Sequence, residues 1–66
     1  MTKAQAQILV ADLVSRDVLP VVTVDQSGTN YTIHATKTGA RITSATMTTI
    51  ATANGVTAQT DRVEFV

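Results

Sequence analysis

Apolar positions in the first part of the chain recur with the period of an α-helix, which we predict over residues 3–17. The helix begins after Thr2, because the Thr2 hydroxyl can accept a hydrogen bond from the amide of Gln5 while the Gln5 side chain reaches back. It must end by Val18, since Pro20 biases the residue before it away from helical backbone angles.

The apolar face of this helix is wider than one sheet requires. Its apolar positions spread over an arc of roughly 260°, whereas packing on one sheet needs only about 100°. Gln5, Asp12 and Arg16 share the remaining stripe. We therefore expect a second surface to cover the surplus flank, which includes Ile8 and Ala11.

Two stretches with the composition of strands follow the first helix. Residues 20–24 are mostly β-branched, and residues 29–35 alternate between apolar and polar side chains. Between them, residues 25–28 are typical of a turn, because Gly28 is free to take a positive φ. The pattern predicts a hairpin with a loop of about four residues.

The next segment is rich in Thr and Ile, as strands are, but three local signals favour a helix over residues 44–53. Thr43 can cap its start, with Ile42 and Met47 as a hydrophobic staple. Apolar residues recur at helical spacing. Gly55 supplies a left-handed residue at the end.

Residues 56–66 form the last predicted strand, with Asp61 and Arg62 marking a bulge or a short turn within it. The element order is then α-β-β-α-β. It predicts an α+β fold in a single small domain over residues 1–66, with two helices on one face of a three-stranded sheet. The predicted core takes apolar residues from every element: Leu9, Leu13, Val22, Val24, Ile33, Met47, Ile50 and Phe65.

Charge and composition exclude several classes of protein. Five basic and five acidic residues balance, and no three basic residues cluster, so the phosphate-neutralising surface of a nucleic-acid-binding protein is missing. No stretch approaches the roughly 18 apolar residues of a membrane span, and polar residues interrupt the start of the chain where a secretory signal needs an apolar run. We expect a protein of the cytoplasm or of a virion, not secreted and with no membrane partner, and the charge balance disfavours nucleic acid as a partner.

Candidate catalytic chemistry is sparse. His34 is the single histidine, hence the one candidate general base near neutral pH, but no nucleophile motif such as G-x-S-x-G accompanies it. Its alternation with Ile33 places it on the outer sheet face, where solvation or an interface contact are the alternatives to catalysis. Without cysteine and with scattered carboxylates, the chain has no metal-ligand spacing. We expect no enzymatic activity, metal or cofactor.

Two basic residues flank a glycine in the loop before the second helix. Lys37 and Arg41 lie on either side of Gly39, and together with the N-terminus of that helix they could hold an anion or a phosphate. The alternative is a solvated loop.

The outer face of the second helix lacks the charges of a solvent-facing helix. Ala45, Thr49 and Thr52 are predicted to point outward, and no charged residue occurs over residues 42–60. Small uncharged side chains let another backbone approach without the desolvation of a charge. We predict a contact surface at these residues, with a general compositional drift toward Thr as the other explanation.

The order of elements and several local residues are shared with a known family. Met1-Thr2-Lys3 opens a capped helix, Thr23-Val24 leads into the Gly28 turn, Ala35-Thr36 closes the hairpin, and a second short helix comes next. In length and in this order, residues 1–54 resemble the small head-to-tail joining proteins of tailed phages. The chain departs from that family in carrying Thr and Ala where the family is rich in Arg, Lys and Glu, and in ending on a predicted strand.

These observations favour a non-enzymatic interaction or assembly module that associates with itself or with a larger protein. The resemblance implies a place in a phage virion, at the head–tail connection. The alternative is a small regulatory protein that binds nucleic acid or inhibits a host enzyme, which requires Lys3, Lys37 and Arg41 to converge. Salt separates the two, because binding through phosphates weakens steeply as salt rises and apolar assembly does not.

Overall fold

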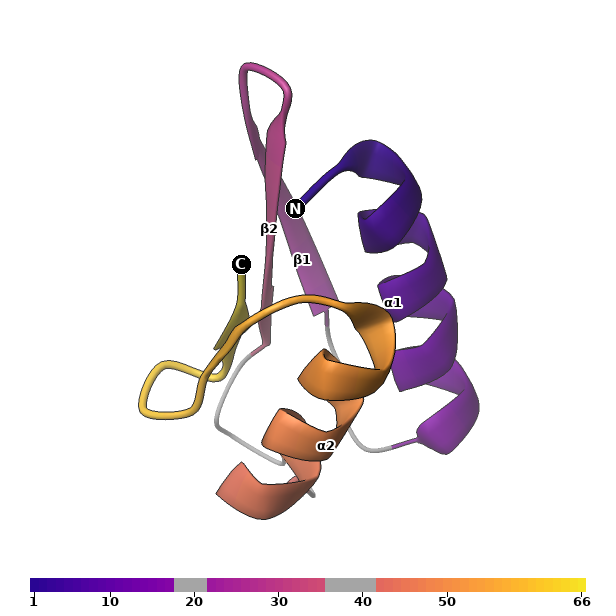
Figure 1. Cartoon of the computed structure of the whole chain (residues 1–66), viewed down its shortest axis with the longest axis vertical. Helices are drawn as coiled ribbons and strands as arrows, with labels where there is room; N and C mark the ends of the chain where they lie inside the picture. Colours follow the sequence, from indigo (N-terminus) through magenta and orange to yellow (C-terminus); the bar gives the residue numbers. More distant parts are fainter. Residues whose placement is uncertain (18–21, 36–41) are drawn as a thin grey trace.

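The computed structural model describes residues 1–17, 22–35 and 42–66, and it shows an α+β fold with two helices and a four-stranded antiparallel sheet (Figure 1). The predicted class is therefore confirmed, whereas the predicted three-stranded sheet is wrong. The elements, in chain order, are α1 (Lys3–Arg16), β1 (Val22–Ser27), β2 (Asn30–Ala35), α2 (Ser44–Asn54), β3 (Ala58–Gln59) and β4 (Glu64–Phe65).

The strands are arranged in the order β1-β2-β4-β3. The fourth strand arises because the predicted last strand folds back on itself: residues 60–63 form a turn, in which the Arg62 amide donates to the Gln59 carbonyl over 3.2 Å. Val63 takes a positive φ of 51° at the end of this turn. The reversal lets β4 pair with β2 on one side and with β3 on the other.

The hairpin of β1 and β2 is tighter than predicted. Asp25 and Gln26 belong to β1, and the loop is the two-residue segment Gly28-Thr29 between the paired residues Ser27 and Asn30. Gly28 has a φ of 62° and Thr29 has no positive φ, which is the pattern of a type II′ turn. The predicted four-residue loop is wrong because Asp25 and Gln26 continue the ladder opposite Thr32 and Tyr31, which leaves only Gly28 and Thr29 unpaired.

The two helices begin and end close to the predicted residues, because the capping groups act as expected. Thr2 and Gln5 form the complete capping box at the start of α1. Thr43 accepts from the Thr46 amide at the start of α2. At the end of α2, Gly55 has a φ of 68°, and the amide of Val56 donates to a carbonyl of the last helical turn, which is the Schellman arrangement.

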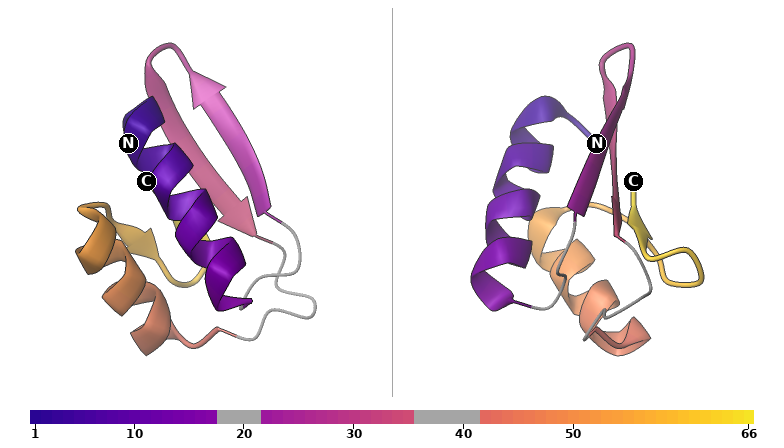
Figure 2. Two further views of the ribbon diagram at one scale, coloured as in Figure 1. Left: turned by 90° about the vertical axis from the view of Figure 1, so that its right-hand side faces the viewer. Right: turned by 180° about the vertical axis from the view of Figure 1, so that it is seen from behind.

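Both helices lie on the same side of the sheet: α1 lies across the hairpin, and α2 lies beside α1 (Figure 2). The fully buried core lies between the helices and the sheet: Ala6, Leu9, Leu13, Ile33, Met47, Ile50, Ala51, Val63 and Phe65. Six of the eight predicted core residues are in this set. Val22 is only half-buried, and the prediction for Val24 is wrong, because it is 47% exposed. The reason is that α1 packs on β2 and leaves β1 at the edge of the sheet.

Candidate interaction surfaces

The outer face of α2 consists of exposed, uncharged side chains, which include Ala45, Thr49 and Thr52. The hydroxyl of Thr49 donates to the Ala45 carbonyl over 3.0 Å, and that of Thr52 to the Thr48 carbonyl over 2.9 Å. Thr48 makes the same bond to Ser44. The hydroxyl hydrogens of these three threonines are therefore all donated to backbone carbonyls of the same helix.

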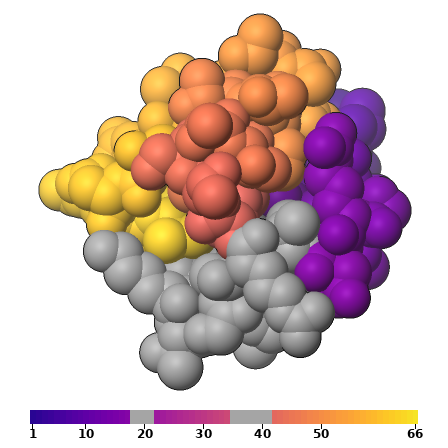
Figure 3. All heavy atoms as spheres, turned by 90° about the horizontal axis from the view of Figure 1, so that it is seen from below, coloured from indigo at the N-terminus to yellow at the C-terminus, as the bar shows by residue number. Residues whose placement is uncertain are grey.

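This bonding changes what the surface offers to a neighbour. A Thr hydroxyl that donates to the carbonyl four residues earlier has no second hydrogen to donate. The α2 face then presents neither a charge nor a free hydrogen on these threonine hydroxyls, and a neighbour can cover it without desolvating an ion. In Figure 3, α2 forms the middle of the lower surface, between the C-terminal segment and the end of α1.

The surplus apolar flank of α1 is exposed in the described structure. Ile8 is 63% exposed and Ala11 is also exposed, as the width of the apolar arc implies. Val14, which the sequence analysis did not single out, is 64% exposed. The apolar arc of the predicted helix already included Val14, which lies three residues after Ala11, on the side of α1 away from α2.

The side of α1 next to α2 is polar and joins the two helices. Asp12 accepts from Arg16 Nε at 2.9 Å on one oxygen and from Asn54 Nδ2 at 3.0 Å on the other. These two hydrogen bonds hold the pKa of the Asp12 carboxyl below its ordinary value, the bond from Arg16 having the larger effect and the bond from Asn54 the smaller. In addition, Gln5 Nε2 donates to the Gly55 carbonyl over 3.4 Å.

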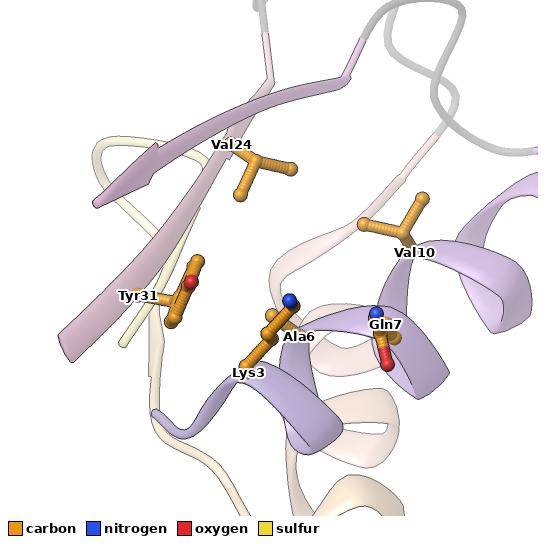
Figure 4. A pocket seen from close by; sticks show the side chains of 6 residues that line it. All are labelled: Lys3, Ala6, Gln7, Val10, Val24 and Tyr31. Carbon is orange, nitrogen blue, oxygen red and sulfur yellow. The ribbon is translucent and has the colours of Figure 1, made fainter. Parts of the chain in front are cut away.

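An apolar hollow of about 360 Å³ lies between α1 and the hairpin. Val24 and Tyr31 project into it from the hairpin, opposite Val10 and Ala6 of α1 (Figure 4). Lys3 and Gln7 complete its lining. Because β1 is an edge strand, the hollow opens beside the unpaired edge of the sheet.

His34 lies on the opposite face of the sheet, between two carboxylates. Its Nε2 is 2.7 Å from Asp25 Oδ2, and its Nδ1 is 2.8 Å from Glu64 Oε2. An imidazole can donate to both only when both nitrogens carry a proton. The side chain thus links β1, β2 and β4 on the outer face, where the alternation had placed it.

Within residues 1–17, 22–35 and 42–66, no cluster of three or more His, Cys, Asp or Glu side chains is arranged to hold a metal ion. Lys37 and Arg41, the candidate anion contacts, lie outside the described residues. Nor does any helix in the described part of the chain have the length and apolar character needed to cross a membrane.

Two features of this surface do not follow from the sequence. The edge position of β1 is the first, because Val24 has the composition of a buried strand residue and only the strand order of the described residues places it in an edge strand. The partners of His34 are the second, because Glu64 comes from a distant segment that the predicted single strand did not place beside β2.

Comparison with protein-family models, with curated proteins and with solved structures finds no match to this chain.

Proposed function

We propose that this chain is a non-enzymatic protein-interaction module that works by assembly with itself or with a larger protein. The observation that carries the proposal is the outer face of α2. Its exposed residues Ala45, Thr49 and Thr52 include no charge, and the two threonine hydroxyls already donate within the helix. Such a face costs little to desolvate, which favours its use as a contact.

The exposed aliphatic side chains of α1 support the same proposal. Ile8 and Val14 are each more than 60% exposed, on a helix whose Leu9 and Leu13 are fully buried. A single exposed aliphatic residue is ordinary, but several on one small domain favour an interaction surface. Ile8 and Ala11 would then lie at the edge of a contact or within it.

The finer assignment is a place in the head–tail connection of a tailed-phage virion. Its support is the resemblance carried by the opening helix, the hairpin and the second helix. In that setting the chain would act in the cytoplasm during assembly and afterwards as a part of the virion.

The test places two charges on the α2 face, by the double variant Thr49→Lys with Thr52→Glu. On a solvated helix these changes alter stability by no more than about 0.5 kcal/mol. At a contact they bury charges and weaken association by several kcal/mol. The measurement is light scattering after size exclusion at micromolar and millimolar concentrations, with the wild type beside the variant.

The matched control puts the same two residue types on the exposed turn after β3, as Asp61→Lys with Arg62→Glu. Both double variants keep the formal net charge at zero. We expect the control to associate like the wild type and the α2 variant to associate more weakly than both. A wild type that is monomeric at both concentrations, melts at the same temperature at both, and retains no protein from a lysate of its source would contradict the proposal.

A further inference from the structure

Within the described residues, the free edge of β1 carries one of the devices that keep edge strands apart, the charge of Asp25, whose carboxylate lies 2.7 Å from His34 Nε2. Among the described residues β1 pairs only with β2, through six consecutive residue pairs without a bulge. Its sequence, Val-Thr-Val-Asp-Gln-Ser, contains no Lys or Pro, and all but its first residue are exposed. The other edge strand, β3, has only two residues. A six-residue edge without Lys, Pro or a bulge is a template on which another strand can pair.

The tight hairpin determines which backbone groups of β1 are free. With a two-residue loop, the closing pair Ser27 and Asn30 exchanges both backbone hydrogen bonds. Because bonding alternates along an antiparallel pair, the amides and carbonyls of Val22, Val24 and Gln26 point away from β2. These three residues therefore offer donors and acceptors at regular spacing along the edge.

An exposed apolar side chain, Val24, lies in this edge strand on the face that carries the helices. Val24 is 47% exposed and lines the hollow together with Val10 and Tyr31 (Figure 4). A strand added to β1 would cover Val24 and close the open side of the hollow, so backbone pairing and apolar burial would occur together.

We infer that the occupant of this edge is the β1 strand of a second copy of the chain, paired antiparallel about a two-fold axis at Val24. In this register Val24 lies opposite its own copy, Val22 opposite Gln26, and Thr23 opposite Asp25. Every free backbone group of the three outward-facing residues then has a partner. No two like charges lie directly opposite one another, whereas an axis at Asp25 would oppose two carboxylates.

The chain also lacks a charge barrier to such pairing. The formal net charge is zero, so two copies do not repel each other through an excess of either sign. The two-fold axis keeps both pairs of helices on the same face, where the two copies of Val24 become neighbours beside α1. The product is one continuous eight-stranded antiparallel sheet, formed from two four-stranded sheets.

This pairing goes beyond the proposed function, because it uses β1 and not α2. The first test is amide hydrogen exchange of the wild type at micromolar and millimolar concentrations. Pairing predicts that exchange slows with concentration at Val22, Val24 and Gln26, while Thr23 and Asp25 are protected at both concentrations by β2. Unchanged exchange at the three outward-facing amides would overturn the inference and leave the α2 proposal standing.

The second test alters the edge without altering the bonds to β2. Val24→Lys places a charge in the two-fold contact and should weaken dimerisation by at least about tenfold. Val24→Pro removes only an outward-facing amide and should do the same. Val24→Thr keeps the branched shape and serves as the matched control. If Val24→Pro does not fold, Val24→Lys carries the test alone.

The third test is cross-linking, which the chain allows because it has no cysteine. Opposed residues of a hydrogen-bonded pair have Cα atoms about 5.5 Å apart, within the range that a disulfide spans. Val24→Cys should therefore form a disulfide-linked dimer in a glutathione redox buffer, and Thr52→Cys on α2 should not do so by this contact. Dimers that survive Val24→Lys and do not cross-link at Val24→Cys would overturn β1 pairing and favour α2.

Discussion

Val63 occupies a backbone conformation that β-branched residues rarely adopt. Its φ of 51° lies in the left-handed region, which costs a residue with a Cβ roughly 1–2 kcal/mol. Val63 is also 6% exposed and belongs to the core. The burial of this side chain thus holds the turn in a geometry that glycine would adopt without strain.

Because burial holds Val63 in a strained backbone conformation, the usual order of stability of an alanine and a glycine variant should be reversed at this position. Val63→Ala and Val63→Gly remove nearly the same core volume, but only the alanine variant keeps the strained Cβ. We expect Val63→Gly to be more stable than Val63→Ala by about 1 kcal/mol. Urea titrations of both variants give the difference.

The control pair lies in the helix interior, where φ is ordinary. Val10→Gly should be less stable than Val10→Ala by about 1 kcal/mol, because glycine has the lower helix propensity. If Val63→Gly is likewise less stable than Val63→Ala, the positive φ at this turn is not a source of strain.

At the scale of elements, Asp12 joins the two helices through one carboxylate. Arg16 and Asn54 donate to its two oxygens, and Asn54 also donates to the Ile50 carbonyl over 2.9 Å. The lowered pKa of Asp12 means that the unfolded chain binds the proton more tightly than the folded one. The stabilisation is complete above the unfolded pKa of about 3.9 and is lost as the pH falls through the lower folded value.

We therefore expect the Asp12→Asn variant to lose less stability than the wild type as the pH falls. The variant should be less stable than the wild type at pH 7, and the difference should shrink steadily below about pH 4. Thermal melts from pH 7 to pH 2 measure it. Asn54→Ala, which removes one of the two hydrogen bonds, should give an intermediate slope; a slope for Asp12→Asn equal to that of the wild type would contradict the role of the pair.

Elements were predictable from sequence where a local chemical signal marks their ends. The Thr2 capping box and the Thr43 cap predicted both helix starts, and Gly55 predicted the end of α2 despite the many threonines. The limits of the strands were not predictable from the sequence, because Asp25 and Gln26 are turn residues by composition yet pair in β1. Their pairing depends on β2, which no local pattern reports.

The candidate contact surface was likewise predictable from the sequence only in part. Periodicity placed Ile8, Thr49 and Thr52 on exposed helix faces, as the structure has them. The free edge of β1 and the exposure of Val24 follow from the strand order. In that order β2 pairs with β1 on one side and with β4 on the other, so β1 is left at the edge of the sheet.

At the scale of the whole molecule, one helix carries both the centre of the core and its uncovered apolar flank. Leu13 is fully buried, whereas Ile8 is 63% exposed on the same helix. The domain has 66 residues and no disulfide, so its stability depends on few buried side chains. A partner that binds the folded state adds stability that increases with concentration.

This difference in burial predicts that two similar truncations in α1 change stability by very different amounts. Leu13→Ala removes a fully buried side chain and should cost about 2–5 kcal/mol, enough to unfold a domain of this size. Ile8→Ala removes an exposed one and should change the stability of the monomer by no more than about 0.5 kcal/mol. Circular dichroism melts at micromolar concentration, where association is least, compare the two. Equal losses would place Ile8 in a packed environment and contradict the exposed flank, whereas a loss for Ile8→Ala confined to millimolar concentration would assign that side chain to the assembled state.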